Sequence, residues 1–121
     1  MRLILALFVF LLVSPLVAFA AMPGAALTTS PDRHFVYLTF SGLQSVSKVN
    51  YTLVYDSNNR QKGFEGGFKT MRYSSKSTRR QILGTCSSGK CVYHKSPRNF
   101  ALEVSFTLKT GGTTTITRSL P

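Results

Sequence analysis

Apolar and polar side chains alternate along most of the chain after residue 33. The longest such run is 100–108, and the same period occurs at 36–40 and 49–55. A period of two puts neighbouring side chains on opposite faces of a β-strand, whereas a helix repeats every 3.6 residues. No comparable stretch repeats at the helical spacing. The pattern therefore predicts an all-β protein whose strands each bury one face.

Clusters of turn-forming residues divide this part of the chain into short segments. They lie at 41–42, 56–59, 66–67, 87–89, 96–99 and 111–112. The strands between them are expected at 34–41, 47–56, 61–70, 78–86, 90–95, 99–109 and 113–119. Three glycines weaken the segment 61–70, so we expect an edge strand or a bulge there. About seven short antiparallel strands are typical of a β-sandwich of two packed sheets.

Residues 1–20 have the features of an export signal. Arg2 gives a positive start, residues 3–13 are apolar, and Ala18-Phe19-Ala20 supplies a small-x-small cleavage pattern. We expect cleavage after Ala20 and a protein that is secreted, periplasmic or on the cell surface. The alternative is an uncleaved anchor, because residues 3–20 carry no charge and are just long enough to span a membrane.

The mature chain is expected to have two parts. Residues 21–32 mix Ala, Pro, Gly, Ser and Thr without a period, which predicts a flexible tether. Residues 33–121 then form the β-sandwich domain.

Cys86 and Cys91 enclose four residues between two predicted strands. In an exported protein this spacing predicts a disulfide across a tight hairpin. The bond needs the closer, non-hydrogen-bonded type of strand pair, because only that pair brings the sulfurs within reach. Two alternatives stay open: a metal site that recruits His94 in the arrangement C-x4-C-x2-H, and a redox-active pair beside Lys90.

The segment 84–94, GTCSSGKCVYH, followed by the alternating strand from Phe100 to Leu108, resembles small exported bacterial proteins of unassigned role. Those proteins are similar to fibronectin type III or immunoglobulin-like β-sandwiches. The resemblance implies a fold class and export, and it transfers no activity and no catalytic residue. The chain departs from true immunoglobulin domains because it has no tryptophan and its two cysteines are too close in sequence to bridge two sheets.

The chain carries a formal net charge of +11, from 15 Lys and Arg against 4 Asp and Glu. Most of the excess lies between residues 60 and 98, where Glu65 is the only acidic residue. A basic face there would attract anionic cell-envelope polymers, acidic polysaccharides or a membrane surface. The candidate polyanion-binding residues are Arg60, Lys62, Lys69, Arg72, Lys76, Arg79, Arg80, Lys90, Lys95 and Arg98.

Other interpretations of this charge stay open. A protein partner is compatible with the basic face, whereas specific nucleic-acid binding is not expected. The non-specific alternative is a basic surface that only keeps a small protein soluble and weakly attracts it to its own cell envelope.

The residues offer little for catalysis. The four carboxylates are spread over a tether, a turn, a glycine-rich segment and a strand face, namely Asp32, Asp56, Glu65 and Glu103. We therefore expect a non-enzymatic interaction module with no cofactor and no metal. The alternative is a small secreted ribonuclease-like hydrolase, in which His34 and His94 flank a phosphate and Lys95 stabilises the transition state. Nothing in the spacing requires these residues to meet.

Overall fold

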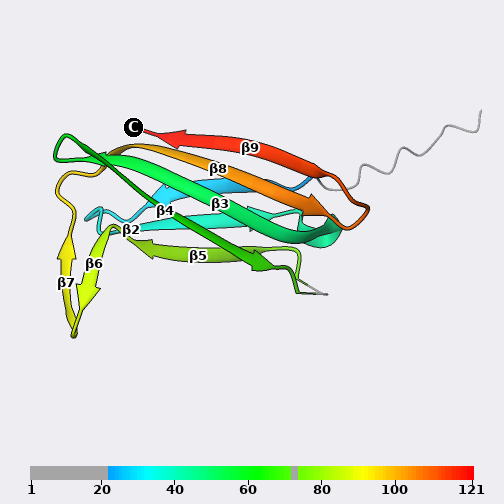
Figure 1. Cartoon of the computed structure of the whole chain (residues 1–121), viewed down its shortest axis with the longest axis horizontal. Helices are drawn as coiled ribbons and strands as arrows, with labels where there is room; N and C mark the ends of the chain where they lie inside the picture. The colour runs from blue at the N-terminus through cyan, green and yellow to red at the C-terminus, as the bar shows by residue number, and fades with distance from the viewer. Residues whose placement is uncertain (1–21, 72–73) are drawn as a thin grey trace, which may run out of the picture.

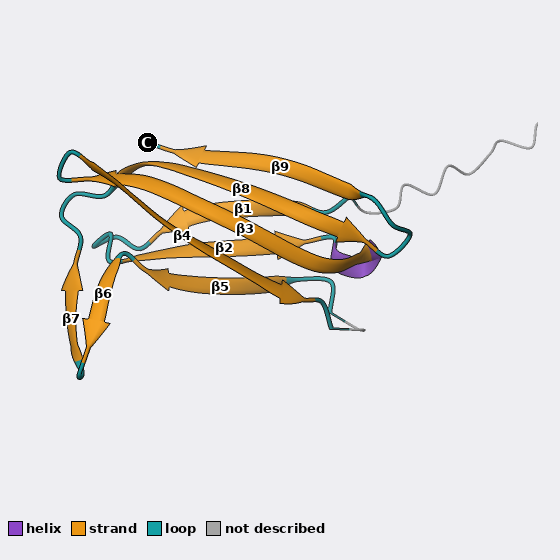
Figure 2. Cartoon of the chain, in the orientation of Figure 1, coloured by secondary structure: helices purple, strands orange, loops and turns teal. Residues whose placement is uncertain are grey.

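The computed structural model describes residues 22–71 and 74–121 (Figure 1). The predicted signal peptide and Arg72 lie outside the described residues. A short 3-10 turn, Leu43–Ser45, lies between the second and third strands (Figure 2). The strands are β1 (Gly24–Thr29), β2 (Phe35–Ser41), β3 (Val46–Ser57), β4 (Arg60–Lys69), β5 (Ser77–Ile82), β6 (Gly84–Ser87), β7 (Lys90–Tyr93), β8 (Arg98–Leu108) and β9 (Thr113–Leu120). The all-β prediction is confirmed.

The strands described form three antiparallel sheets. A three-stranded sheet has the order β1-β2-β5, and a four-stranded sheet has the order β4-β3-β8-β9. Figure 1 shows these two sheets lying over one another, with β4 crossing the view diagonally toward the start of β5. β6 and β7 form a separate hairpin, which projects from one end of the molecule. We call this the hairpin end.

The core lies between the two larger sheets because the alternating apolar positions of both point inward. Phe40 of β2 packs its ring against Tyr51 of β3 and Phe68 of β4, with ring centroids 5.4 and 5.5 Å apart. Phe40 itself is fully buried. The other buried apolar side chains are Leu27, Val36, Leu38, Leu43, Val46, Val49, Leu53, Tyr55, Leu83, Phe100, Leu102, Val104 and Phe106.

The expected tether at 21–32 is wrong for residues 24–29, which form β1. This strand pairs with β2, and Leu27 lies opposite Leu38. Leu27 is only 7% exposed, and Ala25 packs against the core beside it. β1 thus buries few apolar groups and is held by its backbone bonds to β2. Such an edge strand leaves almost no hydrophobic period in the sequence.

The single strand expected at 78–86 is two strands, β5 and β6, separated at Leu83. Leu83 is fully buried, and its backbone is bonded on both sides. Its N–H donates to the His34 carbonyl and its carbonyl accepts from the His94 N–H, each at 2.8 Å. A Cβ at Gly84 would overlap the Val92 carbonyl oxygen. Glycine therefore allows the close backbone contact that starts the hairpin.

β4 pairs with β3 alone, so the expected edge position of the segment 61–70 is confirmed. Its register with β3 is unbroken, and the irregularities lie between β3 and β8 instead. A Cβ at Gly66 would overlap the Tyr51 ring. Glycine at this position lets the Tyr51 side chain pack across the edge strand.

Candidate functional site

The predicted disulfide between Cys86 and Cys91 is confirmed. The two residues are direct partners in the β6–β7 hairpin, and their Cα atoms lie 4.0 Å apart. This short separation belongs to the non-hydrogen-bonded type of antiparallel pair. Ser88 and Gly89 form the turn, with φ of 50° and 78°. Two successive positive φ angles are typical of the turn that joins strands through two residues.

The disulfide excludes the metal site that would use both thiolates. Both sulfurs are bonded to each other, and the third proposed ligand, His94, places its Nδ1 atom 2.7 Å from the Tyr55 hydroxyl oxygen. The side chains from Thr85 to Val92 are exposed. In the described part of the chain, no helix amino terminus lies beside the sulfurs to lower a thiol pKa. The hairpin is thus a covalently closed arm on the surface.

The candidate basic residues do not form one continuous patch. Arg60 pairs with Ser57 at one end of β4, and Lys69 pairs with Lys48 at the other. Those ends are about 30 Å apart along a strand of this length. Lys76 lies just before β5, near the end of β4 that holds Lys69, and the far end of the hairpin holds Lys90.

Four cations gather at the hairpin end, and we call them the hairpin-end cluster: Arg33, Arg60, Lys95 and Arg98. Ser57, the partner of Arg60, donates its hydroxyl to the Lys95 carbonyl at 2.7 Å. The next residue of β3, Asp56, is the cross-strand partner of Arg98.

Arg33 joins this cluster by donating from Nη1 to the Pro97 carbonyl at 2.8 Å. Lys62 lies two residues along β4 from Arg60 and is half-buried opposite Tyr55. Sequence reasoning missed Arg33, because it lies next to Asp32 in a stretch that sums to neutral.

The two arginines of β5 lie over aromatic rings. The Arg79 guanidinium carbon is 4.4 Å from the centroid of the Phe68 ring, which lies near the end of β4. The Arg80 guanidinium carbon is 4.7 Å from the Phe35 ring centroid, on the outer face of the three-stranded sheet. These cation–π contacts fix the position of both arginine side chains and leave both charges at the surface.

Two of the four carboxylates, Glu65 and Glu103, lie elsewhere, on the outer face of the four-stranded sheet. Thr52 of β3 has Glu65 as its partner on one side and Glu103 on the other. Asp56 lies four residues farther along β3, at the hairpin end, where it accepts from Asn99 Nδ2 at 3.1 Å. Between described residues, no Lys or Arg comes within 4.0 Å of a carboxylate oxygen, and the one ion pair found there joins His34 to Asp32. The positive charges are therefore left for solvent and for ligands.

Both histidines line one hollow at the hairpin end. Its volume is about 500 Å³, and its lining comes from the β1–β2 turn and from the chain that leaves β7. The lining residues are Pro31, Asp32, Arg33, His34, Tyr93, His94, Lys95, Ser96 and Pro97. The backbone of Leu83 brings the two histidines together, because its N–H donates to the His34 carbonyl and its carbonyl accepts from the His94 N–H. We call this the histidine hollow.

Each imidazole in the hollow has a partner at its Nδ1 atom. His34 Nδ1 lies 3.3 Å from Asp32 Oδ2, and the His34 ring stacks on Tyr93 with centroids 3.7 Å apart. His94 Nδ1 lies 2.7 Å from the hydroxyl oxygen of Tyr55. Sequence reasoning missed Asp32 and Tyr55 as partners. The signal for Asp32 is its place in the turn before β2, where an Asp side chain commonly accepts from the backbone, as it does here from the His34 N–H at 3.0 Å.

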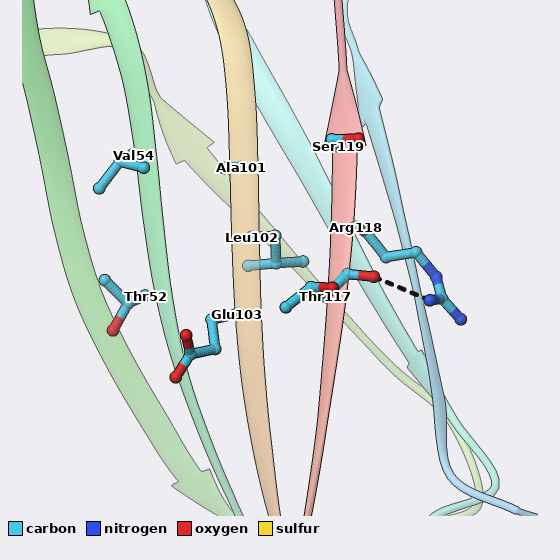
Figure 3. A pocket seen from close by; sticks show the side chains of 8 residues that line it. All are labelled: Thr52, Val54, Ala101, Leu102, Glu103, Thr117, Arg118 and Ser119. Atoms are coloured by element: carbon cyan, nitrogen blue, oxygen red, sulfur yellow. Dashed lines mark hydrogen bonds between the residues drawn. The ribbon is translucent and has the colours of Figure 1, made fainter.

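A larger trough of about 650 Å³ lies on the outer face of the four-stranded sheet (Figure 3). Small aliphatic and hydroxyl side chains line most of it, together with Glu103 and Arg118. The Arg118 side chain points away toward β1, where its Nε donates to the Ala25 carbonyl at 3.0 Å. The trough therefore lies apart from the cation cluster and the histidines.

The chemistry that the hairpin end offers is anion binding. Arg33 and Lys95 line the hollow together with the two imidazoles, and neither cation makes an ion pair within the described residues. Within the described residues, no helix is long and apolar enough to cross a membrane. Comparison with protein-family models, curated proteins and solved structures finds no match for this chain.

Proposed function

We propose that the chain is an exported, non-enzymatic interaction module that binds anionic polymers of the cell envelope or the extracellular space. The binding surface is the hairpin-end cluster together with the cations of β5 and the hairpin. The partners that fit it are acidic polysaccharides, anionic wall polymers and anionic membrane surfaces, because all present closely spaced negative charges.

The observation that carries this proposal is the excess of cations that make no ion pair within the described residues. The chain has 15 Lys and Arg against 4 Asp and Glu, and no described Lys or Arg pairs with a carboxylate. Glu65 and Glu103 lie on a sheet face away from the hairpin-end cluster, and Asp56, the cross-strand partner of Arg98, makes no ion pair with it. Cations that are already unpaired gain contacts with a polyanion without first losing an ion pair, and the bound polymer releases its counterions.

We further propose that the domain is an immunoglobulin-like or fibronectin type III-like β-sandwich. A three-stranded and a four-stranded antiparallel sheet share one core, and the chain passes between them after β2, after β4 and after β7. Crossings of this kind between two packed sheets support such a sandwich. The β6–β7 hairpin is then an insertion between the fifth strand and the eighth.

Export rests on the sequence of residues 1–20. Edman sequencing of the protein recovered from its native cells should give an amino terminus at Ala21. A protein that keeps residues 1–20 and sediments with membranes would support the uncleaved anchor instead.

The polymer-binding proposal is tested by comparing a sulfated polysaccharide, heparin, with uncharged dextran. We expect binding to heparin alone at low salt. The double variant Lys95→Gln/Arg98→Gln should weaken heparin binding by roughly tenfold to thirtyfold, since each Lys or Arg near an anionic surface contributes about 1 kcal/mol.

The matched control is Lys48→Gln/Lys109→Gln, which removes the same charge from the exposed opposite end. We expect this control to weaken binding much less. An equal loss of heparin affinity in the two variants would mean that net charge alone attracts the polymer, as the non-specific alternative states. Equal binding of heparin and dextran would refute the proposal.

The second candidate function is the secreted ribonuclease-like hydrolase. It is favoured by one observation, that His34, His94 and Lys95 line the same hollow. A general acid and a general base must both reach the reacting phosphate, and two histidines that line one hollow support this alternative. Cleavage of RNA by the metal-free protein, lost in His94→Ala and kept in Lys109→Gln, would support the hydrolase. Intact RNA after prolonged incubation would refute it.

A further inference from the structure

The partners of the two histidines decide which ring nitrogens a ligand meets. The Tyr55 hydroxyl bonds to His94 Nδ1, and the Tyr55 side chain is only 3% exposed. Burial raises the pKa of this hydroxyl, so it keeps its proton across the physiological range. A buried O–H needs an acceptor, and His94 Nδ1 is the one that the structure gives it. Neutral His94 then carries its own proton on Nε2, where it can donate to a ligand.

His34 has the opposite arrangement. The hydrogen bond from the Ser30 hydroxyl, 2.6 Å to Asp32 Oδ1, lowers the pKa of Asp32, and the bond from the His34 backbone N–H lowers it further. The carboxylate is therefore ionised and draws the His34 proton to Nδ1. Neutral His34 has only a lone pair on Nε2. It becomes a donor at Nε2 when it takes up a second proton.

The surroundings of the hollow favour an anion over a metal ion. Lys95 and Arg33 line the same hollow, and Arg60 and Arg98 belong to the same end of the molecule. Asp32 is the one carboxylate in the lining, and both of its oxygens already face Ser30 and His34. Tyr93 covers one face of the His34 ring. A cation would meet two or more positive charges here, whereas an anion would meet the donors.

We propose that the histidine hollow is a binding site for a tetrahedral oxyanion, a phosphate or sulfate group carried by the anionic polymer. The His94 Nε2–H, the Lys95 ammonium and the protonated His34 Nε2–H hold its oxygens. The inference rests on the proposed function and names the chemical group that is recognised. It also makes recognition sensitive to pH, because His34 donates at Nε2 only as the imidazolium. Of the charged groups that face His34, Asp32 favours that form and Arg33, Lys95 and His94 oppose it.

The direct test uses free sulfate, whose charge does not change between mildly acidic and neutral pH. Sulfate is titrated into the mature protein at constant ionic strength, and the imidazole signals are followed by NMR. We expect binding to be tighter at about pH 5.5 than at about pH 7.5, because an imidazole that takes up a proton gains a positive charge and a second N–H donor. The signals of both histidines should move together.

Two variants separate the roles of the histidines. His34→Gln should abolish the pH dependence, whereas His94→Gln should weaken binding at both pH values and keep the pH ratio. If either histidine had only a structural role, its replacement would not change the affinity for sulfate and the pH dependence of that affinity independently. The His34 side chain is 40% exposed, so its replacement leaves the core intact, and circular dichroism checks this. Sulfate that causes no shift, or that binds His34→Gln as it binds the unchanged protein, overturns the proposal. So does Zn²⁺ that shifts both imidazoles where sulfate does not.

A comparison of three anionic polymers identifies which group supplies the oxyanion. It also distinguishes a failure of the oxyanion site from a failure of the proposed function. Heparin carries sulfate, poly(glycerol phosphate) carries phosphate and polygalacturonate carries carboxylate alone. We expect the His34-dependent pH effect with heparin, with poly(glycerol phosphate) or with both, and not with polygalacturonate. Salt-sensitive binding of all three without a His34 effect would overturn the oxyanion site and leave polymer binding standing. No binding of any polymer would refute the proposed function itself.

Discussion

Replacing Cys86 and Cys91 by serine should destabilise the domain by about 2 kcal/mol without unfolding it. The disulfide closes a loop with a sequence separation of 5. For a loop of that length, the loss of chain entropy in the unfolded state corresponds to about 2 kcal/mol at 25 °C. No packing term adds to this value, because both cysteines and the residues between them are exposed.

The base of the hairpin stays anchored without the disulfide. Leu83 is fully buried and accepts from the His94 N–H at 2.8 Å, and Tyr93 stacks on His34. We therefore expect the variant to keep a cooperative transition with an unchanged dependence on denaturant. Its urea midpoint, followed by circular dichroism, should fall by about 1 M, which is the free-energy loss divided by an ordinary m-value of about 2 kcal/mol/M.

The matched control is Ser87→Ala/Lys90→Ala, the next pair along the hairpin. It removes two exposed side chains and no covalent bond, so it should change stability by less than about 0.5 kcal/mol. An unchanged midpoint in the cysteine variant would show that the hairpin opens separately from the domain and that the entropy argument does not apply. Loss of the cooperative transition would show that the hairpin is part of the folding core.

Four further changes test other parts of the structure. Leu27→Ala should cost about 2 to 4 kcal/mol in urea unfolding, because Leu27 packs in the core; a change below about 0.5 kcal/mol would mean that residues 24–29 behave as a tether. Phe40→Ala should cost about 3 to 5 kcal/mol by the same assay, since Phe40 is fully buried between the sheets; a smaller effect than that of Leu27→Ala would contradict the core as described. Tyr55→Phe removes the partner of His94 Nδ1 and should lower the free energy of unfolding by about 1 kcal/mol. Among the NMR signals of the two imidazoles, only those of His94 should change. The lowered pKa of Asp32 means that its stabilising contribution is present above the ordinary value of 3.8 and is lost as the pH falls below that value; Asp32→Asn should flatten this part of the curve of melting temperature against pH, and an identical curve would refute the interaction.

The alternation along the chain predicts the strands whose buried face is fully apolar. β3 from Val49 to Tyr55 and β8 from Phe100 to Leu108 are the clearest examples, because every second residue of these segments packs in or against the core. The alternation does not predict β1, because an edge strand with a single buried leucine shows no hydrophobic period. The alternation does not predict the break between β5 and β6 either, because Leu83 is apolar like its neighbour in β5. The break comes from the backbone hydrogen bonds of Leu83 to His34 and His94.

The candidate site is predictable in part. The Cys86–Cys91 bond follows from spacing, since a loop of four residues leaves the hairpin as its natural geometry. The grouping of the cations does not follow, because it depends on the pairing of β3 with β4 and of β3 with β8. The meeting of His34 and His94 depends likewise on the backbone of Leu83, a residue with no chemistry of its own. Long-range register thus decides the site, and local sequence carries little of that register.

The salt dependence of heparin affinity tests the central claim most directly. If the unpaired cations of the hairpin end bind the polymer, the logarithm of the association constant should fall linearly and steeply with the logarithm of the salt concentration. The slope should become shallower by about one to two in Lys95→Gln/Arg98→Gln, which removes two of the contacts. An affinity that does not change with salt, or a slope that is the same in that variant and in the unchanged protein, would contradict the account.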